Sequence, residues 1–477
     1  MITQGSRTDR MSFRNMVVLC LCITFSPSAW STVFVQWNDA TLPPASSLGV
    51  NQIVLAWERG VPTALWATAR KQGYRVYVET PLNQATSAAK ECTEKSCAGI
   101  ILKVLEAESA ETEKSIASLR SAYPKLRVLV LSPTGKQPKM RGSLIIKRNS
   151  VLEVSSPTAQ PWIDTNLAFI KTEQRSRRPQ IPLYTFSWAD QAPQTILTAD
   201  DYSLAVAEAG AFHADLVLQL DEHLQQGLNK RDSEAWALWN QVRSTLKFFA
   251  DASAGVLEPA ANVAVVVDQL DPSDEVANLL SRHNIPFQVF IAADLKTEEL
   301  KGFDIVIVFA KPDPETVEWI KNLATGGATV VAVDAHGKYS WQSSQPVQLN
   351  EHTTSYPVGN GKVLELAEPV SDPETFAQDI RRLLGKRNAL LSLWNGLTTI
   401  AVPYKDRGAR MTLLELVNYA GEPLRLQVQV KGSFTTIRYE TPEHGCCKSL
   451  EPVRHDGFTE FVIPEIRIAG RVHLESQ

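Results

Sequence analysis

Acidic side chains at the ends of apolar, strand-like runs are the residues of this sequence best suited to acid–base chemistry. Glu79 ends the run Arg75–Glu79, and Asp221 with Glu222 follows the run that begins at Asp215. In a parallel barrel the carboxyl ends of all strands meet at one mouth, so these carboxyl groups are expected to share it. Two carboxyl groups across a glycosidic bond can supply the acid and the nucleophile or base for its hydrolysis. We therefore predict Glu79, Asp221 and Glu222 as catalytic residues.

Aromatic and polar side chains occur at the same strand ends, and their types suit a sugar. The chain contains 11 Trp, and indole faces stack on the apolar side of a pyranose while polar groups bind its hydroxyls. The same tryptophans would also suit a core or an interface between domains, and this alternative stays open. The expected substrate-binding residues are Trp37, Asp39, Trp57, Lys103, Trp162, Trp188 and Asp190.

Each acidic candidate also has a structural interpretation. An acid at a strand end commonly caps the following helix or pairs with a nearby cation. Lys103, at the end of the next expected strand, could neutralise Glu79, and such a pair would argue against acid catalysis by Glu79. The expected catalytic pair is otherwise Glu79 as the acid, with Glu222 or Asp221 as the nucleophile or base.

Short apolar runs alternate with amphipathic helical segments from Thr32 to about Asp251, which is typical of parallel strands covered by helices. Eight such runs favour one (β/α)8 TIM barrel, and an open doubly wound sheet is the alternative. No Gly-rich phosphate loop follows the first run, which also favours the barrel. The eight expected strands are Val33–Trp37, Gln52–Trp57, Arg75–Glu79, Gly99–Val104, Arg127–Leu131, Leu144–Ser155, Leu183–Trp188 and Asp215–Asp221. For Leu144–Ser155, a break near Asn149 is left open as an alternative to one continuous strand.

Two further units are expected after a linker at Glu258–Ala260. Strands and helices alternate again from Asn262 to Val333, which predicts a small α/β domain with a parallel sheet. No turn of this domain carries a Cys, so thiol nucleophile chemistry is not expected there. The strict alternation of Leu424–Val430 predicts a β-sandwich. The predicted division is a signal peptide over 1–31, the barrel over 32–255, the α/β domain over 260–392 and the β-sandwich over 393–477.

Two local motifs occur in the later units. Gly359–Gly361 leads into the apolar run Val363–Leu366, and Leu416–Tyr419 begins a strand of the sandwich. With the order of the domains, these motifs resemble family 42 glycoside hydrolases and their relatives. The resemblance implies a TIM barrel, a class I amidotransferase-like middle domain, a β-sandwich and a retaining mechanism with a Glu at the ends of strands four and seven. Those two positions are not matched, since Lys103 stands at the expected height near the end of strand four and Asp190 follows strand seven.

The N-terminus has the charged, apolar, small order of a secretory signal. Arg7, Arg10 and Arg14 precede an apolar run over residues 16–25, and small residues follow it. Cleavage after Ser31 would give an exported protein, periplasmic or extracellular, and an uncleaved anchor is the alternative. No later run approaches membrane length, so no membrane span is expected in the mature protein.

Four cysteines follow this segment: Cys92, Cys97, Cys446 and Cys447. Export permits disulfides. The first two are near enough in sequence for a bridge, and the adjacent last two are expected to form a vicinal disulfide or none. A zinc site with His444 and His455 is a further reading, although the spacing matches no standard ligand pattern.

Charge and composition limit the classes of partner that the protein is expected to bind. The chain has 477 residues, 44% of them hydrophobic, which predicts packed domains. Its 48 basic and 52 acidic residues give a net charge of −4 without a basic stripe, so no nucleic-acid partner is expected. We expect a glycoside-hydrolase-like protein that acts on or binds oligosaccharide at the barrel mouth, with no cofactor and no metal. The alternatives are an inactive barrel that binds glycan or protein, and an envelope protein that forms homo-oligomers.

Overall fold

The computed structural model describes most of the chain beyond the N-terminal segment. The expected signal segment lies outside the described residues apart from Ser31. No helix within the described ranges is both long and apolar enough to cross a membrane. The described ranges are 31–57, 63–104, 110–131, 135–141, 145–148, 151–154, 162–176, 180–188, 197–250, 257–268 and 274–476.

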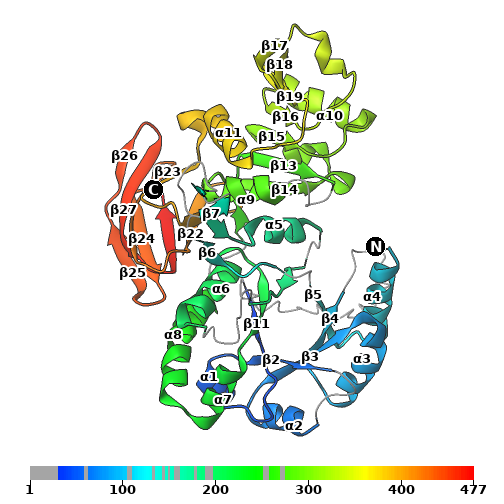
Figure 1. Cartoon of the computed structure of the whole chain (residues 1–477), viewed down its shortest axis with the longest axis vertical. Coiled ribbons are helices and arrows are strands. Elements are labelled where there is room, and N and C mark those ends of the chain that lie inside the picture. Colours follow the sequence, from blue (N-terminus) through cyan, green and yellow to red (C-terminus); the bar gives the residue numbers. More distant parts are fainter. Residues whose placement is uncertain are drawn as a thin grey trace, which may run out of the picture.

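Seven strands close into a barrel in the N-terminal half of the chain (Figure 1). Every neighbouring pair is parallel, and the order around the ring is β1-β11-β10-β5-β4-β3-β2, with β2 beside β1. The closed ring excludes the open doubly wound sheet. The strands are β1 (Val33–Gln36), β2 (Gln52–Ala56), β3 (Arg75–Pro81), β4 (Gly99–Lys103), β5 (Arg127–Leu131), β10 (Leu183–Tyr184) and β11 (Asp215–Gln219).

The sixth expected strand is not part of the barrel. β7 (Ile145–Arg148) and β8 (Val151–Val154) pair with each other in an antiparallel hairpin. β5 pairs directly with β10 through Leu131 and Leu183. Because β5 and β10 are neighbours in the ring, no strand lies between them. The prediction of Leu144–Ser155 as a barrel strand is therefore wrong, and the count of eight strands is not confirmed.

Helices cover the outside of the ring, and α6 is the most deeply buried of them. Thr198 begins α6 by accepting a hydrogen bond from the backbone N–H of Asp201, whose carboxylate accepts in return from the Thr198 N–H. The helices are α1 (Ala45–Leu48), α2 (Thr63–Lys71), α3 (Ala85–Glu94), α4 (Ala110–Ala122), α5 (Leu167–Ser176), α6 (Ala199–Ala211), α7 (Glu222–Lys230) and α8 (Ser233–Ala250). A short antiparallel pair, β6 (Lys139–Arg141) and β9 (Trp162–Asp164), precedes α5.

A seven-stranded sheet follows, in the order β14-β13-β15-β16-β19-β18-β17. Its first five strands are parallel, and β19, β18 and β17 are antiparallel neighbours. Gly361 is needed in the β18–β19 hairpin, because a Cβ there would lie 2.2 Å from the Ala328 carbonyl oxygen. The elements are β13 (Val263–Val267), α9 (Asp274–Arg282), β14 (Phe287–Ile291), β15 (Ile305–Val308), α10 (Pro314–Thr325), β16 (Thr329–Ala332), β17 (Val347–Asn350), β18 (Thr353–Val358), β19 (Gly361–Leu366) and α11 (Pro373–Asn388).

Two antiparallel sheets enclose one hydrophobic core near the C-terminus. The burial of β23 alternates along the strand, as its sequence predicts. The larger sheet has the order β12 (Glu258–Pro259), β21 (Thr399–Lys405), β22 (Met411–Asn418), β28 (Ala469–Glu475), β24 (Thr436–Thr441), β25 (Gly445–Leu450). The smaller sheet has the order β20 (Leu391–Trp394), β23 (Leu424–Lys431), β27 (Phe458–Ile466), β26 (Val453–His455).

A buried polar network joins the barrel to the larger C-terminal sheet. Glu208 of α6 is fully buried and accepts hydrogen bonds from the Tyr419 hydroxyl (2.6 Å), the Asn166 amide (2.6 Å) and the Thr165 hydroxyl (3.0 Å). Burial raises the pKa of Glu208, and these donors act in the opposite direction. The network ties α6, the start of α5 and the end of β22 together.

Helix α5 connects the barrel to the seven-stranded sheet. Figure 1 shows it between the ring and β14. Arg175 lies over the Phe290 ring and forms an ion pair with Glu299 at 2.6 Å. Lys171 lies over the Phe287 ring. One helix therefore packs against two structural units, while the domain boundaries predicted above stay predictions.

Candidate functional site

The carboxyl-end mouth of the barrel is formed by side chains that the strand alternation turns inward. A middle layer inside the ring contains Phe34, Val54, Tyr77, Ile101 and Val217. Residues two positions further along a strand point to the same face. The next layer, at the mouth, therefore includes Gln36, Ala56, Glu79, Lys103 and Gln219.

Glu79 and Lys103 form an ion pair in this mouth. The Lys103 ammonium contacts Oε1 of Glu79, and the two residues come from the adjacent strands β3 and β4. The Glu79 side chain is 4% exposed and that of Lys103 is 44% exposed, so the pair has a buried acid under a cation that reaches solvent. The Glu79–Lys103 pair that the sequence analysis gave as an alternative is therefore present, and its shortest contact is to Oε1 of Glu79.

Asp221 and Glu222 lie at the mouth end of β11 but have different surroundings. Asp221 caps α7 by accepting from the Leu224 N–H at 2.8 Å, and its other oxygen accepts from the Tyr202 hydroxyl at 2.6 Å. Burial and the hydrogen bond to Asp221 raise the pKa of Tyr202, which keeps this phenol a donor. Glu222 occupies the exposed first turn of α7. Asp221 therefore has a structural role that occupies both of its oxygens.

The three predicted acids are not joined into one cluster within the described residues. β3 and β11 are separated around the ring by β2 and β1. No hydrogen bond or ion pair links Glu79 with Asp221 or Glu222 in the part of the chain that the structure describes. The acids share the carboxyl-end side of the barrel, and only Glu79 belongs to the inward layer of its mouth.

Trp37 lies in the core and not on the rim. It is 1% exposed, packs in the layer between strands and helices, and donates from Nε1 to the Thr41 carbonyl oxygen at 2.7 Å. Since Gln36 points into the barrel, the next residue must point outward. The expectation that Trp37 offers a stacking face is therefore wrong.

The other predicted tryptophans are half-buried, and each indole N–H has a partner. Trp57 donates to Glu91 at 2.7 Å. Trp188 donates to the Gln219 carbonyl oxygen at 3.0 Å and makes edge contacts with Phe186 and Tyr202. These bonds fix the orientation of the indoles beside the strand ends.

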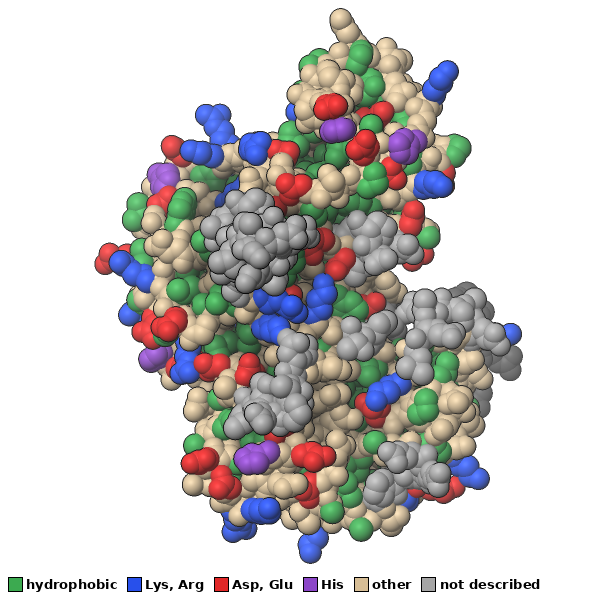
Figure 2. Space-filling view, viewed as in Figure 1, with side chains coloured by type: hydrophobic (Ala, Val, Ile, Leu, Met, Phe, Trp, Pro, Cys, Tyr) green, Lys and Arg blue, Asp and Glu red, His purple; other side chains and the backbone are tan. Residues whose placement is uncertain are grey.

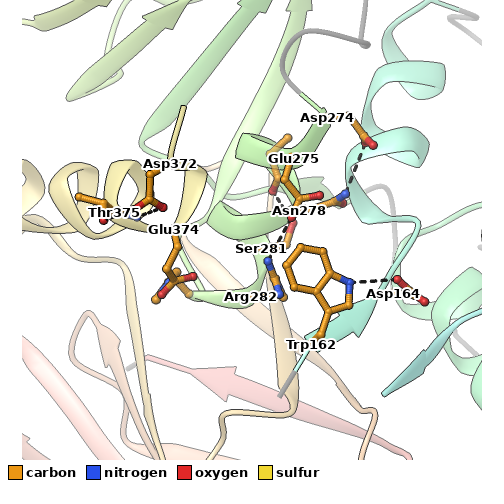
Figure 3. Close-up of polar contacts among 12 residues, drawn as sticks. Trp162, Asp164, Asp274, Glu275, Asn278, Ser281, Arg282, Asp372, Glu374 and Thr375 are labelled. Atoms are coloured by element: carbon orange, nitrogen blue, oxygen red, sulfur yellow. Dashed lines mark hydrogen bonds and ion pairs between the residues drawn. The ribbon is translucent and has the colours of Figure 1, made fainter. Parts of the chain in front are cut away.

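Trp162 is held at the junction with the seven-stranded sheet. Figure 3 shows its indole N–H directed at Asp164 and its ring beside Arg282. The distances are 3.1 Å for the hydrogen bond and 4.0 Å from the guanidinium carbon to the ring centroid. Arg282 also pairs with Glu275 at 3.2 Å. One face of Trp162 is thus covered by Arg282, which leaves at most the other face for a ligand.

The remaining predicted contacts are Asp39 and Asp190. The Asp39 carboxylate accepts from the Thr41 N–H at 3.0 Å, within a local turn after β1. Asp190 lies outside the described residues. Gln36 was expected at the rim, and the structure places it in the inward layer; Thr185 and Gln219 were not predicted, although the period of two along their strands would have placed them inside the mouth.

The sulfur atoms of Cys446 and Cys447 form a vicinal disulfide. Their side chains and Glu440 lie close enough to suggest a metal-binding group, but a disulfide offers no thiolate ligand. His444 contacts Thr441, and His455 pairs with Glu460. The structure therefore has the disulfide and not the zinc–thiolate arrangement, and Cys92 and Cys97 are unbridged.

Comparisons with known proteins give a fold and no sequence relative. No protein-family profile and no curated protein matches the chain. An α-L-fucosidase isoenzyme 2 from Paenibacillus thiaminolyticus superposes with a TM-score of 0.58 at 11% identity, covering 94% of this chain and all of the fucosidase. A cold-adapted β-galactosidase from Rahnella sp. R3 gives a TM-score of 0.52 at 10% identity, covering 90% of this chain and 95% of that enzyme. The chain therefore has the fold of these glycosidases: a closed parallel barrel combined with separate sheets.

Proposed function

We propose that the protein is a glycoside-hydrolase-like protein that acts on an oligosaccharide at the carboxyl-end mouth of its barrel. The observation that carries the proposal is Glu79, a buried carboxylate aimed into that mouth beside a cation. The likeness in fold to an α-L-fucosidase and a β-galactosidase supports it, because it extends over at least 90% of the chain. The N-terminal segment supports export as part of the same proposal.

Glu79 is the group we assign to the reacting bond. Because its ion pair with Lys103 argues against a role as the acid, we propose Glu79 as the nucleophile or base, with its second oxygen contacting the sugar. Lys103 has two further N–H bonds that could reach ligand hydroxyls. Hydrolysis requires a second carboxyl group on the opposite side of the bond, and Glu222 is the exposed acid that we assign to it. Asp221 positions α7, and Trp57, Trp162, Trp188, Asp39 and Asp190 are proposed to contact the sugar.

Turnover of aryl glycosides tests this proposal. The mature protein is incubated with nitrophenyl α-L-fucoside, β-galactoside and β-glucoside, beside Glu79→Gln and Glu222→Gln. Loss of an acid or base is expected to lower kcat by about 10²- to 10⁴-fold. Glu443→Gln, an exposed acid on the far hairpin, is the matched control and keeps full activity. Equal turnover by wild type and both variants would contradict the assignment.

Binding without hydrolysis is the second candidate function, and the ion pair favours it. Lys103 occupies one oxygen of Glu79, and both oxygens of Asp221 are engaged in capping α7 and binding Tyr202. Calorimetric titration with oligosaccharides distinguishes the two. Binding in a protein that turns over no glycoside supports the second candidate, and Lys103→Gln should then weaken the binding.

A further inference from the structure

The turn that follows α3 brings two cysteines together. Ser96, just beyond the helix, has a left-handed backbone with a φ of 56°. Its N–H donates to the Thr93 carbonyl oxygen at 3.3 Å, and the Cys97 N–H donates to the Cys92 carbonyl oxygen at 2.8 Å. These two bonds form a Schellman motif, in which the side chains of the first and last residues commonly contact each other. In this chain those two residues are Cys92 and Cys97.

The backbone separation of the two cysteines fits a disulfide. Standard bond lengths added to the 2.8 Å N···O distance limit the separation of their Cα atoms to about 6.7 Å. Disulfides in proteins span Cα separations of roughly 4.4–6.8 Å. The two thiol side chains also lie close enough to interact directly. Cys92 and Cys97 are unbridged thiols in this structure, and a disulfide between them requires little movement of the backbone.

The two thiols have different surroundings. Cys92 is fully buried in the layer between strands and helices, whereas Cys97 is partly exposed. The hydrogen bond between the two thiols lowers the pKa of Cys97, and the same bond together with burial raises the pKa of Cys92. Because the thiolate is the attacking species in thiol–disulfide exchange, Cys97 is suited to attack and Cys92 to react second.

Trp66 of α2 adds an observation outside the cysteine pair. Its Nε1 atom is buried and has no hydrogen-bond partner among the described residues, and it lies close enough to Cys97 to lower the pKa of that thiol. Arg70 covers the Trp66 ring, with its guanidinium carbon 5.1 Å from the centroid. A buried donor without a partner is unfavourable, and a thiolate at Cys97 would accept from it.

Cys97 can be approached from solvent. Its side chain is partly exposed, and Ser96 beside it is exposed. Figure 2 shows acidic, basic and hydrophobic side chains together at the surface over α2 and α3, at the lower right of the view. A small disulfide reagent therefore reaches Cys97 before it reaches the buried Cys92.

We propose that Cys92 and Cys97 form a reversible dithiol–disulfide site, in which Cys97 attacks a low-molecular-weight disulfide such as oxidised glutathione and Cys92 completes the exchange. The Cys97 sulfur bonds to one glutathione, while the other leaves and takes up the Cys97 proton. The Cys92 sulfur then displaces the bound glutathione, which takes up the Cys92 proton. Two cysteine thiols are thereby oxidised by two electrons, and one glutathione disulfide is reduced to two thiols.

The disulfide would join the end of α3 to the segment that leads into β4. Gly99 begins β4, and Lys103 in the barrel mouth ends it, so the cysteine pair lies at the amino end of this strand. The site is thus at the opposite side of the barrel from Glu79 and Lys103. The inference goes beyond the proposed function and does not depend on it.

Peptide mapping in glutathione buffers tests the proposal. The reduced full-length protein is equilibrated at a series of ratios of oxidised to reduced glutathione, quenched with acid, alkylated in urea and digested with trypsin without reduction. Cleavage after Lys90, Lys95 and Lys103 separates peptides 91–95 and 96–103 unless a disulfide joins them. We expect the joined peptides in about nine-tenths of the chains in excess oxidised glutathione, and two alkylated peptides in excess reduced glutathione.

Single variants test the order of attack. Cys92→Ala should stop at the mixed disulfide, with one glutathione on Cys97. Cys97→Ala should react at Cys92 at least about tenfold more slowly, because Cys92 is buried. The double variant Cys446→Ser with Cys447→Ser is the matched control and leaves the joined peptides unchanged. Far-UV circular dichroism shows that each variant is folded, and the wild-type map holds even if a variant is not.

The same titration in urea shows whether the turn is responsible. The folded chain should favour the disulfide at least about tenfold more than the urea-unfolded chain, because the Schellman motif holds the two cysteines together. Equal oxidation of the folded and unfolded chains overturns the proposal, as do separate alkylated peptides at every glutathione ratio. Glutathione attached to Cys92 in Cys97→Ala as fast as to Cys97 in Cys92→Ala overturns the assigned order of attack.

Discussion

Two buried glutamates of this protein, Glu79 and Glu208, have opposite surroundings. Glu208 lies between α6 and β22, fully enclosed, and protein donors from three residues fill its oxygens. Glu79 lies in the barrel mouth, and it forms an ion pair with a cation that is 44% exposed. The first carboxylate has no room for a ligand, whereas the second faces an opening.

The comparison separates a structural acid from one available for chemistry. A carboxylate whose lone pairs are all occupied by buried donors stabilises an interface, and its removal leaves those donors unsatisfied. A carboxylate that is paired with a half-exposed cation contributes less to stability, because that cation is solvated once the carboxylate is removed. Substitution of Glu208 should therefore lower the stability of the fold, whereas substitution of Glu79 should mainly lower activity.

The largest expected effect is the destabilisation caused by Glu208→Ala. Loss of this carboxylate leaves the Tyr419 hydroxyl, the Asn166 amide and the Thr165 hydroxyl without their acceptor, which lowers the free energy of unfolding by about 3 kcal/mol or more. Urea unfolding followed by circular dichroism measures it. Glu79→Ala is the matched control, and its free energy of unfolding is expected to fall by about 1 kcal/mol. Equal losses in the two variants would remove the distinction.

A pH effect of about 2–3 kcal/mol on stability is expected at the amino end of the barrel strands, where Asp215 begins β11. Burial raises the pKa of Asp215 to about 6, while the Thr32 N–H and Arg127 act in the opposite direction. The folded state therefore holds this proton more tightly than the unfolded state, so the stabilisation is present below about pH 4 and is lost as the pH rises to about 6. The free energy of unfolding of wild type relative to Asp215→Asn should fall across that window. A difference that stays constant with pH contradicts the burial argument.

A smaller loss is expected for Tyr419→Phe. This change removes one donor to Glu208 and leaves the Asn166 amide and Thr165 hydroxyl bound to it. The free energy of unfolding should fall by about 1 kcal/mol. In the double variant with Glu208→Ala the effect of Tyr419→Phe should shrink, because its acceptor is already gone. Additive losses would show that the two side chains act independently.

The smallest effect is expected for Lys103→Gln. The ammonium is half-exposed and the glutamine amide still offers an N–H to Glu79, so the substitution should change the free energy of unfolding by about 0.5 kcal/mol or less. Its effect on oligosaccharide binding should be larger than its effect on stability. Thermal unfolding and calorimetric titration of the same sample compare the two, and a variant that unfolds readily but binds normally would reverse the roles assigned to the pair.

Strand positions were predictable because buried parallel strands are short apolar runs. Seven of the eight expected runs are barrel strands, and β23 alternates as its sequence indicates. Leu144–Ser155 failed because apolar content alone does not distinguish a barrel strand from a hairpin. β5 pairs directly with β10, so the ring has no place between them for a further strand. This pairing is a long-range contact that the local sequence does not encode.

The candidate site was predicted less completely than the strands. The Glu79–Lys103 pair follows from two neighbouring strand ends, so the sequence could indicate it. The prediction for Trp37 was wrong because it did not consider which face of the strand this side chain occupies. Glu208 was missed, although a lone acid among the small apolar residues of Leu204–Ala211 is a signal of a buried polar contact.

The pairing of β12 with β21 sets a condition on the order of synthesis. Glu258 and Pro259 leave the ribosome before Tyr404 and Lys405, the residues with which they pair. At roughly 5–20 residues per second, this edge segment waits on the order of ten seconds for its neighbour. The edge strand β12 of the larger C-terminal sheet is thus synthesised well before the other strands of that sheet. A nascent chain released before residue 399 would lack β21, the strand with which β12 pairs.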